Sequence, residues 1–328
     1  MAAPVQNATP ATAGTVKLTA DLVSRMVMVK SFSENEQRIN SIDFTADGQT
    51  MITSSDDDSI VMYNCNLGTK TRAVNSKKYG VDLIRFTHNH NTGIHCSTKV
   101  DDTIRYLSLH DNKYIRYFPG HTKKVLTLCM SPQDDMFLSG SEDKTIRLWD
   151  LKSPNCQGVM QVTSRAVAAF DPDGLIFGAG VNSQSVKLYD LRSFDKGPFM
   201  TWQLEQEPNC DWTGMKFSPD GKHILITTDG EVMRVIDAFT GTQKHVLRGH
   251  VNARRQPLEA AFTPDSQFVL CGSSNGIVNA WNVESGQKNA DIQTDHTGLI
   301  QQVAFNPRFF IMATACTKLN LWIPPDDA

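Results

Sequence analysis

Two short segments contain residue types that could carry out chemistry, but neither has the spacing of a catalytic or ligand-binding site. The acidic run Asp56-Asp57-Asp58 could offer oxygen ligands to a metal ion, yet its place between two apolar runs favours a polar turn. The pair Gly178-Ala-Gly180 lacks the third glycine of a dinucleotide-binding loop. No P-loop, G-x-S-x-G, H-E-x-x-H or C-x-x-C motif occurs. The sequence therefore predicts a protein that is not an enzyme and that needs no metal ion or cofactor.

The charge balance excludes several classes of protein. The 328 residues include 32 Lys and Arg against 35 Asp and Glu, a net charge of −3, which disfavours binding to nucleic acid through net charge. No apolar run reaches the length of about 18 residues that a membrane span needs. The seven cysteines are an odd number in a long chain, which argues against a disulfide framework and favours an intracellular protein.

A motif repeats seven times along the chain and determines the expected fold. Each copy has an apolar run ending in an aromatic residue or methionine, then a polar turn and two further β-type runs. Successive anchor residues are 40–47 positions apart, and they are Phe44, Phe86, Met130, Phe170, Phe217, Phe262 and Phe305. Four short strands in a unit of about 43 residues are typical of a β-propeller blade. We therefore expect an all-β, seven-bladed β-propeller with almost no helix, whose blades bury each other's apolar faces.

The runs at the two ends of the chain predict how the ring closes. Only six residues follow Trp322, so the seventh unit has no outer strand of its own. An additional run, RMVMVKSF at 25–32, precedes the first unit. We expect this run to be the outer strand of the last blade, because that pairing removes an open sheet edge. The predicted organisation is a disordered tail at 1–16, free of charged residues, and a single domain at 17–328.

The third unit, which contains GH and then SGSEDKTIRLWD, resembles a WD repeat. In that family a His before the first strand, a Ser on the second, an Asp in the next turn and the Trp form a hydrogen-bonded tetrad. The resemblance assigns these roles to His121, Ser139, Asp143 and Trp149. A buried indole N–H and a buried carboxylate both need partners, which is the physical reason for such a set. Other units keep it only in part: the second has Lys77 where the His is expected.

The resemblance extends beyond the repeat. Longer blocks are similar to the Swd-two type of WD-repeat subunit of Set-one (COMPASS) histone H3 lysine-4 methyltransferase complexes, and these blocks are 56–61, 79–85, 101–121, 153–158 and 187–199. The resemblance covers the chain from about residue 21 to its end. It implies a nuclear, non-catalytic scaffold that takes part in histone methylation. Such a scaffold would bind peptide segments of the Set-one type catalytic subunit and link it to the phosphorylated tail of transcribing RNA polymerase II.

The same resemblance leaves a second function open. Relatives also join a complex with protein phosphatase one that acts in transcription termination and mRNA 3′-end processing. The chain could instead be a regulatory subunit of that cleavage and polyadenylation complex. The sequence does not separate the two functions, because one surface could serve both partners in turn. In either case we expect a monomer within a larger complex, with no membrane contact and no sequence-specific binding of nucleic acid.

One face of the expected propeller should carry the residues best suited to recognition. In this fold, the loops before the first strands and the turns between second and third strands lie on the same face. The candidates on that face are Lys77, Lys78, Tyr79, Lys123, Lys124, Arg254 and Arg255, with Arg165 and Trp212 near the channel mouth. Clustered cations favour an acidic or phosphorylated peptide, and Trp or Arg at a channel mouth is typical of a binding hot spot. The alternatives are solvated loop charges and side chains that fill the channel wall.

Two further aromatic segments are candidate docking sites. The outer strand KYIRYF of the second unit contains Tyr114 and Phe118, which alternate with Ile115 and Tyr117, so one of the two sets faces outward. We assign Tyr114 and Phe118 to a partner-binding surface, with ordinary packing as the alternative. The loop RSFDKGP should expose Phe194 beside charged residues, and it is the weaker docking site.

Overall fold

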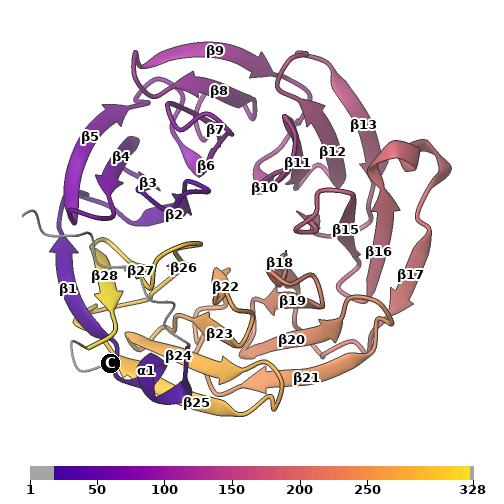
Figure 1. Cartoon of the computed structure of the whole chain (residues 1–328). Helices are drawn as coiled ribbons and strands as arrows, with labels where there is room; N and C mark the ends of the chain where they lie inside the picture. The colour runs from indigo at the N-terminus through magenta and orange to yellow at the C-terminus, as the bar shows by residue number, and fades with distance from the viewer. Residues whose placement is uncertain (1–17, 326–328) are drawn as a thin grey trace, which may run out of the picture.

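The short apolar runs pair with their neighbours in sequence and form seven antiparallel four-stranded sheets, arranged as blades around a central channel (Figure 1). The computed structural model describes residues 18–325, so the tail expected at 1–16 lies outside the described residues. Each blade runs outward from its first strand at the channel to its fourth strand at the rim. The prediction of a seven-bladed β-propeller is confirmed.

The first four blades follow the chain in order. Blade one consists of β2 (Ile39–Phe44), β3 (Thr50–Ser55), β4 (Ser59–Asn64) and β5 (Thr69–Asn75). Blade two consists of β6 (Asp82–Phe86), β7 (Thr92–Cys96), β8 (Ile104–Ser108) and β9 (Lys113–Phe118). Blade three consists of β10 (Val125–Met130), β11 (Met136–Ser141), β12 (Thr145–Asp150) and β13 (Cys156–Gln161). Blade four consists of β14 (Val167–Phe170), β15 (Ile176–Val181), β16 (Ser185–Asp190) and β17 (Met200–Gln203).

The last three blades complete the ring. Blade five consists of β18 (Trp212–Phe217), β19 (His223–Thr228), β20 (Val232–Asp237) and β21 (Gln243–Arg248). Blade six consists of β22 (Ala260–Phe262), β23 (Phe268–Cys271), β24 (Ile277–Asn282) and β25 (Lys288–Gln293). Blade seven consists of β26 (Gln302–Phe305), β27 (Met312–Ala315), β28 (Leu319–Ile323) and β1 (Val27–Phe32). All seven anchor residues of the repeat are the last residue of the first strand of their blade.

The N-terminal strand closes the ring as predicted. β1 pairs antiparallel with β28, from Val27 opposite Ile323 to Phe32 opposite Leu319. The Phe32 ring also contacts Tyr63 of blade one, with the two ring centroids 4.7 Å apart. The strand therefore completes blade seven and covers the junction between the last blade and the first.

The hydrophobic core is divided among the junctions between blades. Residues 18–325 contain seven buried apolar clusters, and each one combines side chains from two neighbouring blades. At the junction of blades two and three, for example, Phe118 packs with Phe137 and Trp149. Because each sheet buries its faces only against its neighbours, the blades depend on the closed ring for their stability.

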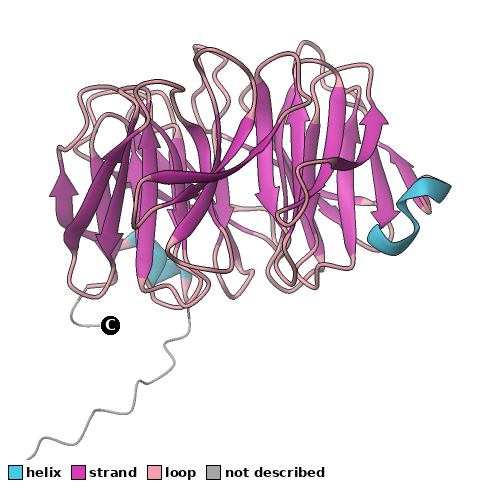
Figure 2. Ribbon diagram, turned by 90° about the horizontal axis from the view of Figure 1, so that it is seen from above, coloured by secondary structure: helices cyan, strands magenta, loops and turns pink. Residues whose placement is uncertain are grey.

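Two short helical segments interrupt the β structure. Helix α1 (Ala20–Ser24) begins at Thr19, whose side chain accepts a hydrogen bond from the Leu22 N–H, and it packs Val23 into the junction of blades six and seven. The 3₁₀ helix η1 (Leu191–Lys196) connects β16 to β17. Figure 2, which shows the ring from its edge, draws these two helices in cyan beside strands that cross the full thickness of the ring. Within the described residues, neither helix is long and apolar enough to cross a membrane.

Candidate functional site

Antiparallel pairing determines which loops share a face of the ring. We call upper face the side formed by the loops before each first strand and the turns between second and third strands; β28, the third strand of blade seven, ends at the opposite face. All seven loop cations predicted from the sequence lie on the upper face or at the channel mouth, because they occupy such loops. The geometry of three places on this face determines what it can bind: the blade-three tetrad, the rim of blade two and the channel mouth.

The tetrad of blade three forms one chain of hydrogen bonds. Trp149 Nε1 donates to Ser139 Oγ at 2.8 Å, and this oxygen lies 2.7 Å from His121 Nε2. His121 Nδ1 lies 2.8 Å from Asp143 Oδ2. Since the Ser139 oxygen accepts from the indole, its own proton is directed to Nε2, and the imidazole proton must be at Nδ1, where it donates to Asp143.

The protonation states of this tetrad follow from burial and hydrogen bonding. Burial lowers the pKa of His121, which keeps the ring neutral, although Asp143 opposes the effect. Burial opposes ionisation of Asp143, but hydrogen bonds from Thr145, His121 and the Thr122 N–H outweigh it and lower the pKa of Asp143 to about 2. A neutral imidazole therefore donates to a charged carboxylate, and the tetrad holds the loop before blade three in place.

Blade two builds a different group at the equivalent position, and we call it the blade-two cluster: Lys78, Tyr79, Arg105 and Tyr117. The Arg105 side chain is 4% exposed and pairs with Asp101 through two N–O contacts of 2.7 and 2.8 Å. Its guanidinium lies 3.7 Å from the Tyr79 ring centroid and 5.5 Å from that of Tyr117. Lys78 Nζ lies 4.9 Å from the Tyr79 centroid. The result is a stack of cations and aromatic faces at the rim of the upper face.

The structure decides which side chains of β9 face outward. Phe118 is 1% exposed and packs between blades two and three, so it is not available to a partner. Tyr114 is half-buried, and its hydroxyl lies 2.9 Å from Ser76 Oγ. The outward set is Ile115 and Tyr117, which are 50% and 45% exposed. The predicted outward pair, Tyr114 and Phe118, is therefore wrong, because alternation alone does not say which side of the strand faces the neighbouring blade.

Ion pairs neutralise part of the expected basic face. Lys124 pairs with Asp82 at 3.5 Å, and Arg255 pairs with Asp229 at 2.8 Å. Among the described residues, the exposed side chains of Lys77, Lys123 and Arg254 have no ion-pair partner, and Lys78 contacts the ring and the hydroxyl of Tyr79. The free positive charge of the upper face is therefore concentrated near blade two and on the loops before blades three and six.

Arg165 is the cation at the channel mouth that lacks a partner within residues 18–325. Its Nε atom is buried without a hydrogen bond, as is the hydroxyl of neighbouring Ser164. Both residues line a cavity of about 320 Å³. Burial lowers the pKa of Arg165, while Glu142, Asp229 and Asp211, which line the same cavity, counteract the effect. The guanidinium thus has N–H groups free to donate to a ligand at this cavity, which Glu142, Asp211 and Asp229 also line.

Two other predicted contact residues pack against the core and do not project into solvent. Trp212 is 3% exposed and packs with the apolar residues between blades four and five, so it fills the channel wall, which was the alternative expectation. Phe194 turns inward from η1 and stacks near Phe177 and Tyr189, with ring centroids 5.8 Å from each. The exposed aromatic residue of this connection is Phe199, which is 55% exposed. The 3₁₀ turn, which the sequence analysis did not anticipate, explains the difference.

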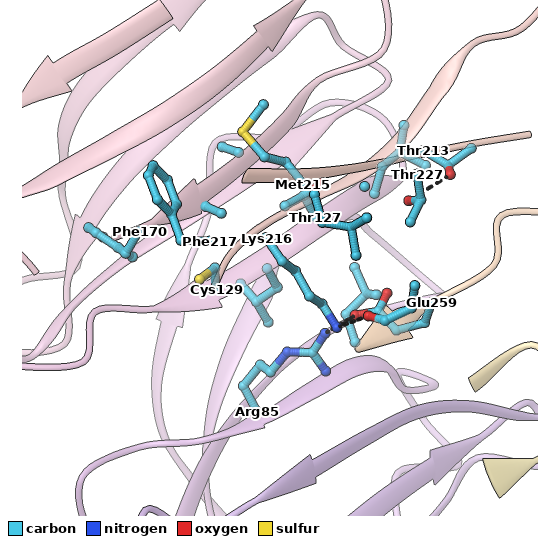
Figure 3. Close-up of a pocket in the computed structure, with 18 residues that line it drawn as sticks. Arg85, Thr127, Cys129, Phe170, Thr213, Met215, Lys216, Phe217, Thr227 and Glu259 are labelled. Atoms are coloured by element: carbon cyan, nitrogen blue, oxygen red, sulfur yellow. Dashed lines mark hydrogen bonds and ion pairs between the residues drawn. The ribbon is translucent and has the colours of Figure 1, made fainter. Parts of the chain in front are cut away.

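The middle of the channel holds a group of charges that the sequence analysis missed (Figure 3). Glu259 Oε1 lies 2.5 Å from Lys216 Nζ and 4.0 Å from Arg85 Nη2. Arg85 comes from β6, Lys216 from β18, and Glu259 immediately precedes β22, so three blades converge on one carboxylate. They line a cavity of about 280 Å³. No repeat pattern marks these residues, because each one belongs to a different blade.

The described residues 18–325 contain no group of three His, Cys, Asp or Glu side chains placed to hold a metal ion. What the upper face offers instead is contact chemistry: exposed lysines, aromatic rings that stack on a guanidinium, and an unpaired arginine beside a cavity. Such groups bind acidic or phosphorylated chain segments.

Comparison with known proteins agrees with this architecture. The WD domain, G-beta repeat family matches residues 26–64, 112–150 and 241–282. The chain is 59% identical to WD repeat-containing protein 82 of Drosophila melanogaster over 312 residues, which are 95% of this chain and 98% of that protein. It is 42% identical to Set1 complex component swd2 of Schizosaccharomyces pombe, over 80% of this chain and 76% of the relative. It is 32% identical to COMPASS component SWD2 of Saccharomyces cerevisiae, over 94% and 98% of the two chains.

Two of these similarities cover 94–95% of the chain, which is nearly the whole ring. An identity of 59% over nearly the full length of both chains exceeds what a shared repeat alone would produce. The chain therefore belongs to the Swd2-type family of WD-repeat proteins.

Proposed function

We propose that this chain is a non-catalytic scaffold subunit of a nuclear, Set1/COMPASS-type histone H3 lysine-4 methyltransferase complex, and that it binds a peptide segment of the catalytic subunit. The observation that carries the proposal is the similarity, over 94% of the chain, to a protein named COMPASS component SWD2. A second relative, Set1 complex component swd2, supports it.

The closed ring supports a binding role on physical grounds. Seven inter-blade clusters and the tetrad of blade three hold the loops of the upper face in a fixed arrangement. A disordered partner segment then contributes most of the ordering cost, because the surface that receives it is already ordered. This division of cost favours recruitment of short linear segments.

The blade-two cluster, together with Lys77, is the part of the upper face best suited to that segment. Lys77 and Lys78 are exposed, and the rings of Tyr79 and Tyr117, which both contact the Arg105 guanidinium, present apolar surface beside them. An acidic or phosphorylated segment gains charge-assisted contacts from the lysines and apolar contact from the rings. The phosphorylated tail of RNA polymerase II has this chemistry, and we propose it as a further ligand of the same face.

Charge reversal on the upper face tests the proposal. The variant Lys77→Glu/Lys78→Glu is compared with a matched control, Lys30→Glu/Lys196→Glu, which reverses two exposed lysines on β1 and η1. Each is expressed with an affinity tag, and the proteins recovered from nuclear extract are measured by mass spectrometry. We expect the first variant to lose the Set1-type catalytic subunit by about tenfold or more, and the control to retain it.

A second measurement separates the two proposed ligands. Binding to a polymerase-tail peptide is measured with and without phosphate, for the wild type and both variants. Equal recovery of the catalytic subunit by both variants, with intact folds, would overturn the proposed surface. Recovery of phosphatase-one subunits in place of methyltransferase subunits would overturn the proposed complex and favour the alternative function in mRNA 3′-end processing.

A further inference from the structure

Blade seven contains a tetrad in which a thiol takes the place of the carboxylate. The turn between β27 and β28 reads Cys316-Thr317-Lys318 and has no aspartate. His296 Nδ1 lies 3.0 Å from Cys316 Sγ, whereas in blade three the equivalent nitrogen of His121 lies 2.8 Å from Asp143 Oδ2.

The direction of the hydrogen bonds makes this sulfur an acceptor. Trp322 Nε1 donates to Thr314 Oγ1 at 2.9 Å, and this oxygen lies 2.9 Å from His296 Nε2. Because the Thr314 oxygen accepts from the indole, its own proton is directed to His296 Nε2. The Ser139 hydroxyl makes the same two hydrogen bonds in blade three. The imidazole proton is therefore at Nδ1 and points at Cys316 Sγ, an arrangement that favours the thiolate.

The surroundings of the sulfur agree with that reading. Cys316 is partly exposed, and its neighbours Thr317 and Lys318 are exposed. Burial opposes ionisation of the thiol, but the hydrogen bond from His296 and the Lys318 backbone outweigh it and lower the pKa of Cys316 to about 7. Burial instead raises the pKa of Cys65 and of Cys271 to about 12.

The other charged groups near the sulfur already have partners or point into solvent. Lys318 lies on the same turn and is exposed. Asp295, next to His296 in the chain, accepts a hydrogen bond from Asn320 Nδ2 at 2.5 Å. Across the seam, Arg38 of blade one pairs with Asp56 at 3.0 Å. His296 is thus the titratable group in direct contact with the sulfur.

We propose that Cys316, held by His296, is a thiol-modification site of this protein and that it reacts selectively with hydrogen peroxide. The sulfur attacks one peroxide oxygen, an S–O bond forms and the O–O bond breaks, which yields a sulfenic acid and hydroxide. The sulfur loses two electrons and the peroxide gains them, and the hydroxide leaves into solvent, where the buffer acid protonates it to water. This site lies on the upper face at blade seven, outside the blade-two cluster, and its chemistry does not depend on the proposed function.

The position of the site connects its chemistry to ring closure. The backbone carbonyl of Cys316 accepts a hydrogen bond from the Ile39 N–H of blade one at 2.7 Å. Oxidation replaces the charged acceptor of His296 with a neutral and larger group at this seam. The modification therefore acts where the last blade meets the first.

The chain provides its own controls for a test. Cys156 and Cys210 are also partly exposed, and no histidine contacts them. The folded wild-type protein is treated with hydrogen peroxide at pH 7, sulfenic acid is trapped with dimedone, and each of the seven cysteines is quantified by peptide mass spectrometry. A thiol with a pKa near ambient pH reacts faster than an ordinary one, so we expect labelling of Cys316 about fivefold faster than that of either control.

The pH profile and one variant separate this mechanism from simple exposure. The labelling rate of Cys316 should reach half its maximum near pH 7 and level off at higher pH. His296→Gln should slow labelling at pH 7 and recover it at pH 9. Equal rates at all three cysteines, or a Cys316 rate without a plateau, would overturn the proposal even if the variant does not fold.

Discussion

The blade-three tetrad requires a hydroxyl group at Ser139, because this one group both accepts and donates a hydrogen bond. Its hydroxyl accepts from Trp149 and donates to His121, and the side chain is fully buried. Removing the hydroxyl leaves an indole N–H and an imidazole nitrogen without partners in the interior. We expect Ser139→Ala to lower the free energy of unfolding by about 1–3 kcal/mol.

Urea unfolding followed by tryptophan fluorescence measures this change. Ser33→Ala, at an exposed serine, is the control and should differ from the wild type by less than about 0.5 kcal/mol. A Ser139→Ala protein as stable as the control would contradict the assignment of the hydrogen bonds.

His95 predicts a dependence of stability on pH. The ring is fully buried in β7, its Nε2 has no hydrogen-bond partner, and burial lowers its pKa to about 4. The unfolded chain, with an ordinary pKa near 6.5, binds the proton first as the pH falls, so stability is lost between about pH 6.5 and 4. We expect this one group to account for about 2 kcal/mol of the loss between pH 7.5 and 5.

The variant His95→Leu replaces the imidazole with an apolar side chain of similar size that does not titrate. Its free energy of unfolding should fall by about 2 kcal/mol less than that of the wild type over the same pH range. Parallel decreases in the two proteins would show that His95 does not titrate as its burial requires.

At the level of elements, β1 carries the closure of the ring. It supplies the fourth strand of blade seven and places Phe32 against Tyr63 of blade one. Deleting residues 24–33 removes both contacts and opens a sheet edge, so we expect the Tm to fall by about 10 °C or more. Deleting 1–16 is the control, and differential scanning calorimetry should show a Tm within about 2 °C of the wild type. Two equal Tm values would mean that the ring is stable without its closing strand.

The elements also show where sequence reasoning succeeds and where it stops. The seven anchors fall at the ends of the first strands because the repeat places a large apolar residue where each strand meets the same turn. Period-two alternation predicts two faces for β9 but does not say which one is buried, so Phe118 was assigned to the surface and Tyr117 was missed. Phe194 was misplaced because η1 turns its ring back into the blade.

The candidate site was predictable only in part, for a related reason. Loop cations such as Lys77 and Lys78 can be placed on the upper face from topology alone. Whether a cation is free depends on neighbours from other blades, and Asp82 and Asp229 neutralise Lys124 and Arg255. Arg105 and Cys316 were missed because Tyr79 and His296, which contact them, lie in loops distant in sequence and come close only in the folded ring.

At the scale of the whole molecule, charged side chains in the channel connect blades on opposite sides of the ring. Each apolar cluster links only adjacent blades. Glu259 is different, because it contacts Lys216 of blade five and approaches Arg85 of blade two, which is not a neighbour of either blade (Figure 3). Burial opposes ionisation of Glu259, but Lys216 and Arg85 outweigh it and lower the pKa of the carboxyl. The carboxylate thus links blades that share no sheet-to-sheet contact.

A double-mutant cycle measures that link. With Glu259→Gln, Arg85→Met and the double variant, we expect a coupling energy of about 1 kcal/mol at pH 7, a modest value because the side chains are 29% and 18% exposed and the charged atoms lie 4.0 Å apart. The folded pKa of Glu259 lies below the unfolded one, so the contribution is present above about pH 4.5 and disappears as the pH falls through the folded value. Lys152 and Asp135, an exposed pair within blade three, form the control cycle. A channel pair coupled no more strongly than this control would mean that the ring is held by its inter-blade clusters and by β1 alone.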